Sequence, residues 1–195
     1  MKIEIRSNDC AVISGYVNAV ERRSKVLMRP GAPPFRETVK PGTFRKALDR
    51  GNPVELKLNH QRTLCDTGSG LELREDNVGL YASAVVTDRE TVDAARSGRL
   101  TGWSFGFRCL QDSWKPDDGG VELRELEDIR LDEVSILTKT PAYIATSVEV
   151  RDDELFEQRT AEDTAEIADN TPKSPDFSVM KAELELLSLG GKKYE

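Results

Sequence analysis

The chain has 195 residues, of which 37% are hydrophobic and 32% charged, and its net charge of −7 is carried mainly by residues 151–195. This length allows one domain of ordinary size with a tail, and no apolar run approaches the roughly 18 residues that span a membrane. The three cysteines lack metal-ligand spacing and the N-terminus has no signal-peptide core, so we expect reduced thiols, no metal site and no secretion.

Residues 1–150 are predicted to consist mostly of strands. Apolar or alternating runs predict strands at residues 3–6, 11–17, 54–58, 71–74, 79–86, 102–110, 121–126, 131–137 and 147–150. Residues 75–78 are expected to form a hairpin turn, and the proline-rich residues 29–41 an irregular loop.

Two short helices are expected among these strands. One covers residues 43–50 with Thr43 as its N-cap, and the other covers residues 88–96, capped by Thr87 or Asp88. The order of elements lacks a βαβ rhythm. We therefore expect a mainly β fold, an antiparallel β-barrel with peripheral short helices, because closure removes the exposed edges of so many strands.

Residues 151–195 are expected to be an acidic tail beyond a barrel domain of residues 1–150. The tail holds 12 Asp and Glu against 6 Lys and Arg, which argues against binding to nucleic acid. Residues 178–188 are a helix candidate whose apolar stripe can dock on a partner. The alternative is a disordered tail without a partner.

His60 is the only histidine of the chain and follows the predicted strand 54–58. No other side chain titrates near neutral pH without a large shift, so His60 is the expected base if the chain is a hydrolase. Ser104, flanked by Gly102 and Gly106, is the candidate nucleophile. The alternative is a solvated loop histidine and an ordinary strand serine beside glycines that mark a bulge or corner.

Residues 102–106 match the G-x-S-x-G pattern of the α/β-hydrolase nucleophile elbow, but their context does not. The elbow places a helix after the serine, whereas Phe105, Phe107 and Leu110 continue a strand pattern. The histidine also precedes the serine, contrary to the order in that fold. We therefore reject an α/β-hydrolase.

A third group must orient the imidazole, and it must be an acid or an amide because no second histidine exists. The best candidates are Asp132 and Glu133, within the predicted strand 131–137. A buried acid in such a strand needs a partner. Strict alternation groups Asp132 with Val134 and Ile136, and the pattern does not choose between the two acids.

Other candidate groups have weaker patterns. A loop cysteine close in sequence to a histidine rarely reaches the imidazole correctly, and an aspartate cluster without EF-hand spacing is typical of a solvated turn. The residues concerned are Cys65, Ser135, Asp112, Asp117 and Asp118.

Taken together, these segments resemble the prohead serine proteases of tailed bacteriophages. The resemblance covers about residues 11–150 and rests on the order and spacing of short motifs. They are Gly15-Tyr-Val-Asn18, Phe35-Arg-Glu-Thr-Val39, Pro41-Gly-Thr-Phe44, Leu58-Asn-His60, Leu100-Thr-Gly-Trp-Ser-Phe-Gly-Phe107, and Leu131-Asp-Glu-Val-Ser-Ile136 leading to Pro141-Ala142.

The resemblance implies a fold like that of the herpesvirus assemblins, with His60 as the motif histidine and Ser104 as the nucleophile. The herpesvirus enzymes use a second histidine as third member, and this chain departs from that pattern. The Glu-Val-Ser centre of the phage motif favours Glu133 over Asp132. The loop of residues 138–142 is our candidate for the backbone donors to the oxyanion.

The implied function is that of a serine endopeptidase that cleaves scaffold and capsid proteins, and then itself, inside the procapsid in the host cytoplasm. The implied partners are a scaffold protein, or the scaffold segment of the major capsid protein, and the major capsid protein itself, without nucleic acid, membrane, metal or cofactor. The alternative is a non-catalytic assembly protein that keeps a protease-like fold. Cleavage specificity and homo-oligomerisation stay open.

Overall fold

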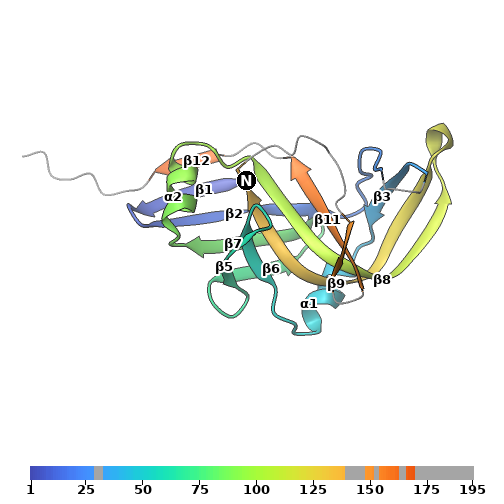
Figure 1. Ribbon diagram of the computed structural model, residues 1–195, viewed down its shortest axis with the longest axis horizontal. Helices are drawn as coiled ribbons and strands as arrows, with labels where there is room; N and C mark the ends of the chain where they lie inside the picture. The colour runs from blue at the N-terminus through green and yellow to red at the C-terminus, as the bar shows by residue number, and fades with distance from the viewer. Residues whose placement is uncertain (29–32, 139–147, 152–153, 163–165, 170–195) are drawn as a thin grey trace, which may run out of the picture.

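The computed structural model describes residues 1–28, 33–138, 148–151, 154–162 and 166–169, and these residues form two β-sheets (Figure 1). One sheet has five strands in the order β12-β1-β2-β7-β6. The other has seven, in the order β10-β11-β8-β9-β4-β5, with β3 also paired to β9. The predicted mainly β fold is confirmed. No helix of the described part is long and apolar enough to cross a membrane.

The five-stranded sheet is built on the antiparallel pair β1 (Lys2–Ser7) and β2 (Cys10–Ala19). β7 (Gly79–Val86) pairs with β2, β6 (Leu71–Glu75) pairs with β7, and β12 (Glu166–Asp169) lies parallel to β1. The β6–β7 pairing confirms the predicted hairpin. In β1 the alternating isoleucines are fully buried, as expected for a strand with one face on the core.

The seven-stranded sheet is built on the long antiparallel hairpin of β8 (Gly102–Pro116) and β9 (Glu122–Leu137), which bends strongly along its length (Figure 1). β3 (Phe35–Val39) and β4 (Glu55–Leu58) both pair with β9 in parallel, and β5 (Arg62–Asp66) returns antiparallel to β4. β11 (Glu154–Glu162) pairs antiparallel with the other edge of β8, and β10 (Val148–Arg151) pairs with β11.

The observed topology differs in part from the expected antiparallel barrel. The described strands form two sheets with three parallel pairings, and they do not close into one antiparallel barrel. Alternation identifies strands, but it does not reveal their partners. β9 is also a single strand where two were predicted, because bulges rather than a turn absorb the irregular pattern in its middle.

Residues 29–41 were expected to be an irregular loop, but they contain the strand β3. Pro33 and Pro34 precede this strand and Pro41 follows it, so no proline interrupts its ladder with β9. The acidic tail also contains strands, namely β11, β12 and part of β10. The helix expected at residues 178–188 lies outside the described residues.

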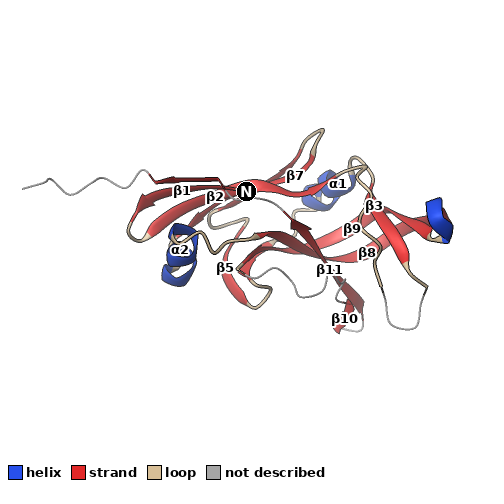
Figure 2. Ribbon diagram, turned by 90° about the horizontal axis from the view of Figure 1, so that it is seen from above, coloured by secondary structure: helices blue, strands red, loops and turns tan. Residues whose placement is uncertain are grey.

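The core contains the apolar faces of both sheets, and its largest side chains come from β8. Trp103, Phe105 and Phe107 are each at most 1% exposed. Phe44 of helix α1 (Thr43–Asp49) packs edge-on against Phe105 with ring centroids 5.5 Å apart. Helix α1 contacts β9 and β6, while α2 (Arg89–Arg96) contacts β1 and β2 (Figure 2).

The N-cap of α1 differs from the prediction. Gly42 is the N-cap, with a left-handed φ of 86°, whereas Thr43 is buried and its hydroxyl donates to Leu126 O at 3.1 Å. The carboxylate of Glu75 supplies the acceptors, since it receives the backbone N–H groups of Gly42 and Arg45 at 2.6 Å each. A side chain distant in sequence thus replaces the local cap.

The N-terminus of α2 follows the local rule. Asp88 is the N-cap, and its Oδ1 accepts the backbone N–H of Thr91 at 2.9 Å. The N-cap is therefore Asp88 and not Thr87, because Asp88 directly precedes the helix and its carboxylate reaches the third helical N–H.

The substitution Glu75→Ala is expected to destabilise the fold by about 1–3 kcal/mol, because it leaves two backbone donors at the start of α1 without their charged acceptor. Urea unfolding monitored by circular dichroism measures this change. The matched control is Glu72→Ala in the same strand, whose side chain is exposed and whose loss should cost less than about 0.5 kcal/mol. Equal effects of the two substitutions would contradict the capping role of Glu75.

Candidate active site

His60 lies in the tight turn that joins β4 to β5. The backbone N–H of Gln61 donates to Leu58 O at 3.1 Å, and Asn59 and His60 have φ values of 52° and 62°. Positive φ at both central positions is typical of a type I′ hairpin turn. Because a left-handed conformation costs a non-glycine residue roughly 1–2 kcal/mol, other contacts must hold this turn.

Asn59 makes those contacts. Its Nδ2 donates to Thr138 Oγ1 at 2.9 Å, and its Oδ1 accepts the backbone N–H of Thr138 at 2.9 Å. Its own backbone N–H donates to Ile136 O at 2.9 Å. The turn is thereby attached to the end of β9, which places the imidazole of His60 beside the side chains of that strand.

Glu133 of β9 contacts the imidazole directly. Its Oε1 lies 2.5 Å from His60 Nδ1, and its Oε2 lies 2.8 Å from Lys57 Nζ. The Glu133 side chain is 1% exposed. A carboxylate on Nδ1 favours the tautomer that carries its proton there, which leaves Nε2 as the nitrogen able to accept a proton.

Opposing effects determine the charge of Glu133 and Lys57. Burial raises the pKa of the Glu133 carboxyl, but the hydrogen bonds from His60 and Lys57 outweigh burial and hold that pKa below its ordinary value. Burial lowers the pKa of Lys57, but its bonds to Glu133 and Glu55 outweigh burial and hold its pKa above the ordinary value. Both groups are therefore charged at neutral pH, and Lys57 acts as a fixed cation.

A β-bulge explains why Glu133 faces the histidine. Gly106 of β8 pairs with Glu133, but the next residue, Phe107, pairs with Leu131, so Asp132 is the extra residue of β9. The bulge lets both Leu131 and Val134 face the core while Glu133 faces the opposite side. Strict alternation across this segment, which would group Asp132 with Val134, is wrong at the bulge.

Asp132 makes contacts of a different kind. Its Oδ1 lies 3.0 Å from Arg130 Nε, and its Oδ2 lies 3.5 Å from Arg108 Nε. The structure thus places Asp132 among arginines and Glu133 at the imidazole.

Ser104 lies on the same face of the sheet as Glu133. It pairs with Ser135 of β9, and directly opposite residues of a ladder share a face. Ser135 Oγ lies 3.2 Å from His60 Nδ1, so the imidazole lies over the strand next to that of Ser104. Serine, histidine and acid therefore gather on one side of the β8–β9 hairpin, and the aromatic core lies on the other.

The hydroxyl of Ser104 is engaged by another strand. It is fully buried and donates to the backbone carbonyl of Arg159 in β11 at 2.7 Å, while Thr160 Oγ1 lies 3.4 Å from it. Among the described residues, no hydrogen bond joins Ser104 to His60. In this conformation the candidate nucleophile is thus bonded to β11 and not to its candidate base.

Gly106 occupies a position with no room for a side chain. A Cβ atom there would lie 2.2 Å from Phe156 Cζ and 2.7 Å from Glu133 Cγ. The missing side chain therefore leaves a notch on the sheet face, and Phe156 and Glu133 fill it. β8 continues as a strand to Pro116, so no helix follows Ser104 as a nucleophile elbow would require.

Except for Ser135, which contacts His60, the weaker candidates of the sequence lie elsewhere. Cys65 is in β5 and packs against the core, and burial raises the pKa of its thiol, which opposes nucleophilic activation. The aspartates of the β8–β9 turn region pair with arginines: Asp112 with Arg124, Asp117 with Arg23 and Arg36, and Asp118 with Arg23. The described residues contain no group of three or more potential metal ligands.

The sequence did not indicate that Lys57 contacts Glu133, or that β11 contacts Ser104. Lys57 alternates with Leu56 and Leu58 in the predicted strand, which marks it as facing away from the core but does not show what it faces. The parallel pairing of Lys57 with Ser135, which puts it beside Glu133, is a tertiary contact. Of the loop proposed for oxyanion donors, only Thr138 is described, and its backbone N–H is bonded to Asn59.

The ionised Glu133 is expected to make folding stability depend on acid pH. Its pKa in the folded protein lies below the ordinary 4.5, so its contribution is present above about 4.5 and is lost as pH falls through the folded value. The stability gap between the parent and Glu133→Gln should therefore narrow below pH 4.5, measured by urea unfolding between pH 3 and pH 7. The exposed Glu72→Gln is the control, and a gap independent of pH would contradict the assignment.

The substitution Gly106→Ala is expected to destabilise the fold by about 1–3 kcal/mol, because the buried Phe156 ring or Glu133 must move to admit a methyl group. Thermal unfolding measures the loss. The control is Gly68→Ala, at an exposed turn where the nearest atom to the new Cβ is an Asp66 side-chain oxygen at 3.3 Å. A neutral Gly106→Ala would show that the notch is not tightly filled.

Comparison with known families gives one match. A family model described as Caudovirus prohead serine protease matches residues 1–161, which is most of the chain. No curated protein and no solved structure matches the chain, so the expected likeness to the herpesvirus assemblins is not confirmed. The span of the family match includes His60, Ser104, Glu133 and nearly all of β11. The chain belongs to the caudovirus prohead serine protease family.

Proposed function

We propose that this chain is a serine endopeptidase that acts during procapsid maturation, with Ser104 as nucleophile, His60 as base and Glu133 as the orienting acid. Membership of the prohead protease family suggests a maturation protease. The observation that carries the assignment of residues is the 2.5 Å contact of Glu133 with His60 Nδ1, on the sheet face that also holds Ser104.

In the proposed reaction, Ser104 Oγ attacks the carbonyl carbon of the scissile peptide while His60 Nε2 takes the hydroxyl proton. Glu133 stabilises the resulting imidazolium and keeps the ring oriented. His60 then gives the proton to the leaving amine, and water hydrolyses the acyl-enzyme by the reverse sequence of proton transfers.

Lys57 supports this arrangement by holding the second oxygen of Glu133. A carboxylate with only one partner could rotate about its terminal torsion, whereas contacts at 2.5 Å and 2.8 Å on opposite oxygens restrict that rotation. The turn geometry of Asn59 and His60 restricts the imidazole in the same way. The site is therefore preorganised around the histidine, and Ser104 must release Arg159 O to complete it.

We propose as substrates the scaffold protein, or scaffold segment of the major capsid protein, and the major capsid protein itself, followed by the protease. This assigns the activity to the interior of the procapsid in the host cytoplasm. The family name supports the setting, and the substrates are our extension of it.

The variant Ser104→Ala is expected to abolish proteolysis, with a loss of at least about a thousandfold, since removal of a nucleophile leaves only residual catalysis. The chain and its variant are each co-expressed with scaffold and capsid protein, and intact masses are followed over time. Fragments formed by the parent and absent from the variant support the proposal.

Two further serine variants separate the roles. Ser135→Ala removes the other hydroxyl near His60 and should retain measurable cleavage, whereas Ser83→Ala in the five-stranded sheet should behave like the parent. If Ser135→Ala alone abolishes cleavage, Ser104 is not the nucleophile. A parent that stays whole and cleaves neither partner supports the non-catalytic assembly protein instead.

A further inference from the structure

β11 occupies the edge of β8 that carries Ser104. The seven residues Gly102–Arg108 pair antiparallel with Glu162–Phe156, and Ser104 pairs with Thr160 (Figures 1 and 2). The other edge of β8 is taken by β9. β11 therefore covers the only edge at which a further extended chain could pair with the strand of the candidate nucleophile.

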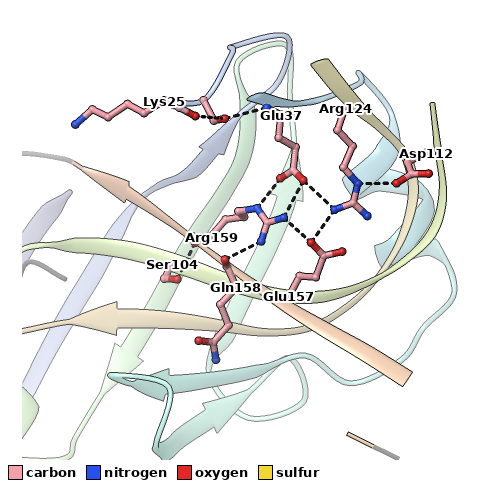
Figure 3. Close-up of polar contacts among 9 residues, drawn as sticks. Lys25, Glu37, Ser104, Asp112, Arg124, Glu157, Gln158 and Arg159 are labelled. Atoms are coloured by element: carbon pink, nitrogen blue, oxygen red, sulfur yellow. Dashed lines mark hydrogen bonds and ion pairs between the residues drawn. The ribbon is translucent and has the colours of Figure 1, made fainter. Parts of the chain in front are cut away.

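The contact between Ser104 and β11 competes with catalysis. The hydroxyl proton that His60 would accept is donated to Arg159 O at 2.7 Å, and Ser104 is fully buried under this arrangement (Figure 3). A proton held by a backbone carbonyl is not available to the imidazole. While β11 is in place, the nucleophile is neither activated nor accessible.

β11 also fills the notch at Gly106. Phe156 is 1% exposed, and its Cζ lies 2.2 Å from the position that a Cβ of Gly106 would take. This notch borders Glu133 Cγ, so it lies next to the acid of the site. An apolar side chain of another extended peptide, paired to β8 in the same way, would meet the same notch.

On the opposite face, β11 enters a buried ion cluster (Figure 3). Arg159 contacts Glu37 at 2.7 and 2.8 Å, and Glu157 contacts Arg124 at 2.7 Å and Arg159 at 2.5 Å. Glu37 and Arg124 also contact each other at 3.1 Å. β11 therefore contributes one charge of each sign, and the body of the protein keeps one of each sign.

This balance makes separation of β11 electrostatically feasible. An unpaired buried charge is strongly destabilising, but departure of β11 removes a cation and an anion together. Glu37 then keeps Arg124 as its partner, and Arg124 also contacts Asp112, whose Oδ2 lies 2.6 Å from Arg124 Nε. Departure of β11 therefore leaves Glu37 and Arg124 paired with each other.

We propose that the β8 edge from Gly102 to Arg108 is the surface on which this protease binds extended peptide segments, and that β11 is its intramolecular occupant. A substrate segment would replace β11 by adding a strand to the sheet, with its backbone paired to β8 and an apolar side chain in the Gly106 notch. Reactivity of Ser104 then scales with the fraction of molecules in which β11 has left. The proposal rests on the proposed role of Ser104 as nucleophile.

A fluorophosphonate probe tests this on the full chain. Ser104 Oγ would bond to phosphorus, fluoride would leave, and His60 would take the hydroxyl proton, so the adduct is counted by intact mass and located by peptide mapping. The variant Phe156→Ala is expected to label at Ser104 at least about tenfold faster than the parent, and excess synthetic peptide of residues 154–162 should slow that labelling. Leu155→Ala is the matched control, since its side chain is 56% exposed.

The outcomes separate the two proposals. Equal labelling of Ser104 in the parent and in folded Phe156→Ala overturns the role of β11 and leaves the nucleophile assignment intact. Absence of a Ser104 adduct in every folded form overturns the proposed function, and this proposal with it. The variant Ser104→Ala shows how much labelling is non-specific.

Hydrogen exchange of the parent needs no substitution and covers the case in which Phe156→Ala fails to fold. Amides of residues 156–160 are expected to exchange at least about tenfold faster than the central amides of the β8–β9 pairing, through opening of β11 alone. Exchange of both sets at one common rate, limited by global unfolding, would overturn the proposal.

Discussion

The burial of one carboxylate governs the arrangement of this site. Glu133 is almost completely enclosed, and an enclosed carboxylate stays ionised only when positive or proton-donating groups compensate its lost hydration. Lys57 comes from β4 and His60 from the turn after it, so the parallel pairing of β4 with β9 delivers both partners at once. The contacts that fold this region therefore also set the geometry of the site.

A single extra residue in β9 decides which acid lies at the imidazole. Without the bulge at Asp132, alternation would place Asp132 and Val134 on one face, and Leu131 and Glu133 on the other. With it, Leu131 and Val134 both reach the core, and Glu133 is left to face Gly106. Gly106 is needed for the same arrangement, because a side chain at this position would collide with Glu133. Bulges of this kind commonly re-aim a side chain beside a functional site.

The two faces of the β8–β9 hairpin carry different kinds of side chain. One face buries stacked aromatic rings, with Phe105 and Phe107 centroids 5.3 Å apart, and these two residues pair with Arg159 and Glu157 of β11. The other face carries Ser104 and Glu133. The burial of the ion cluster that receives β11 is weak evidence of stabilisation, since the desolvation of its charges opposes their attraction. What it specifies is register: a slip of one residue would exchange Glu157 and Arg159 for neighbours on the opposite face.

The sequence alone identified three kinds of candidate residue for the site and much of the local structure. A lone histidine, a serine between glycines and an acidic pair in an apolar strand are properties of short segments, as are the strand periodicities and the cap of α2. The family was also recognisable from the order of its motifs, and the family match agrees with that resemblance.

Tertiary structure decided what depends on contacts between distant segments. Capping of α1 by Glu75, the parallel pairing of β3 and β4 with β9, and the choice of Glu133 all depend on pairings that alternation does not encode. The same holds for β11. Its mixed charges are typical of a solvated tail, and only the fold shows that they pair with Glu37 and Arg124. Periodicity reports which way a side chain points relative to its own strand, and only the folded chain determines what it meets there.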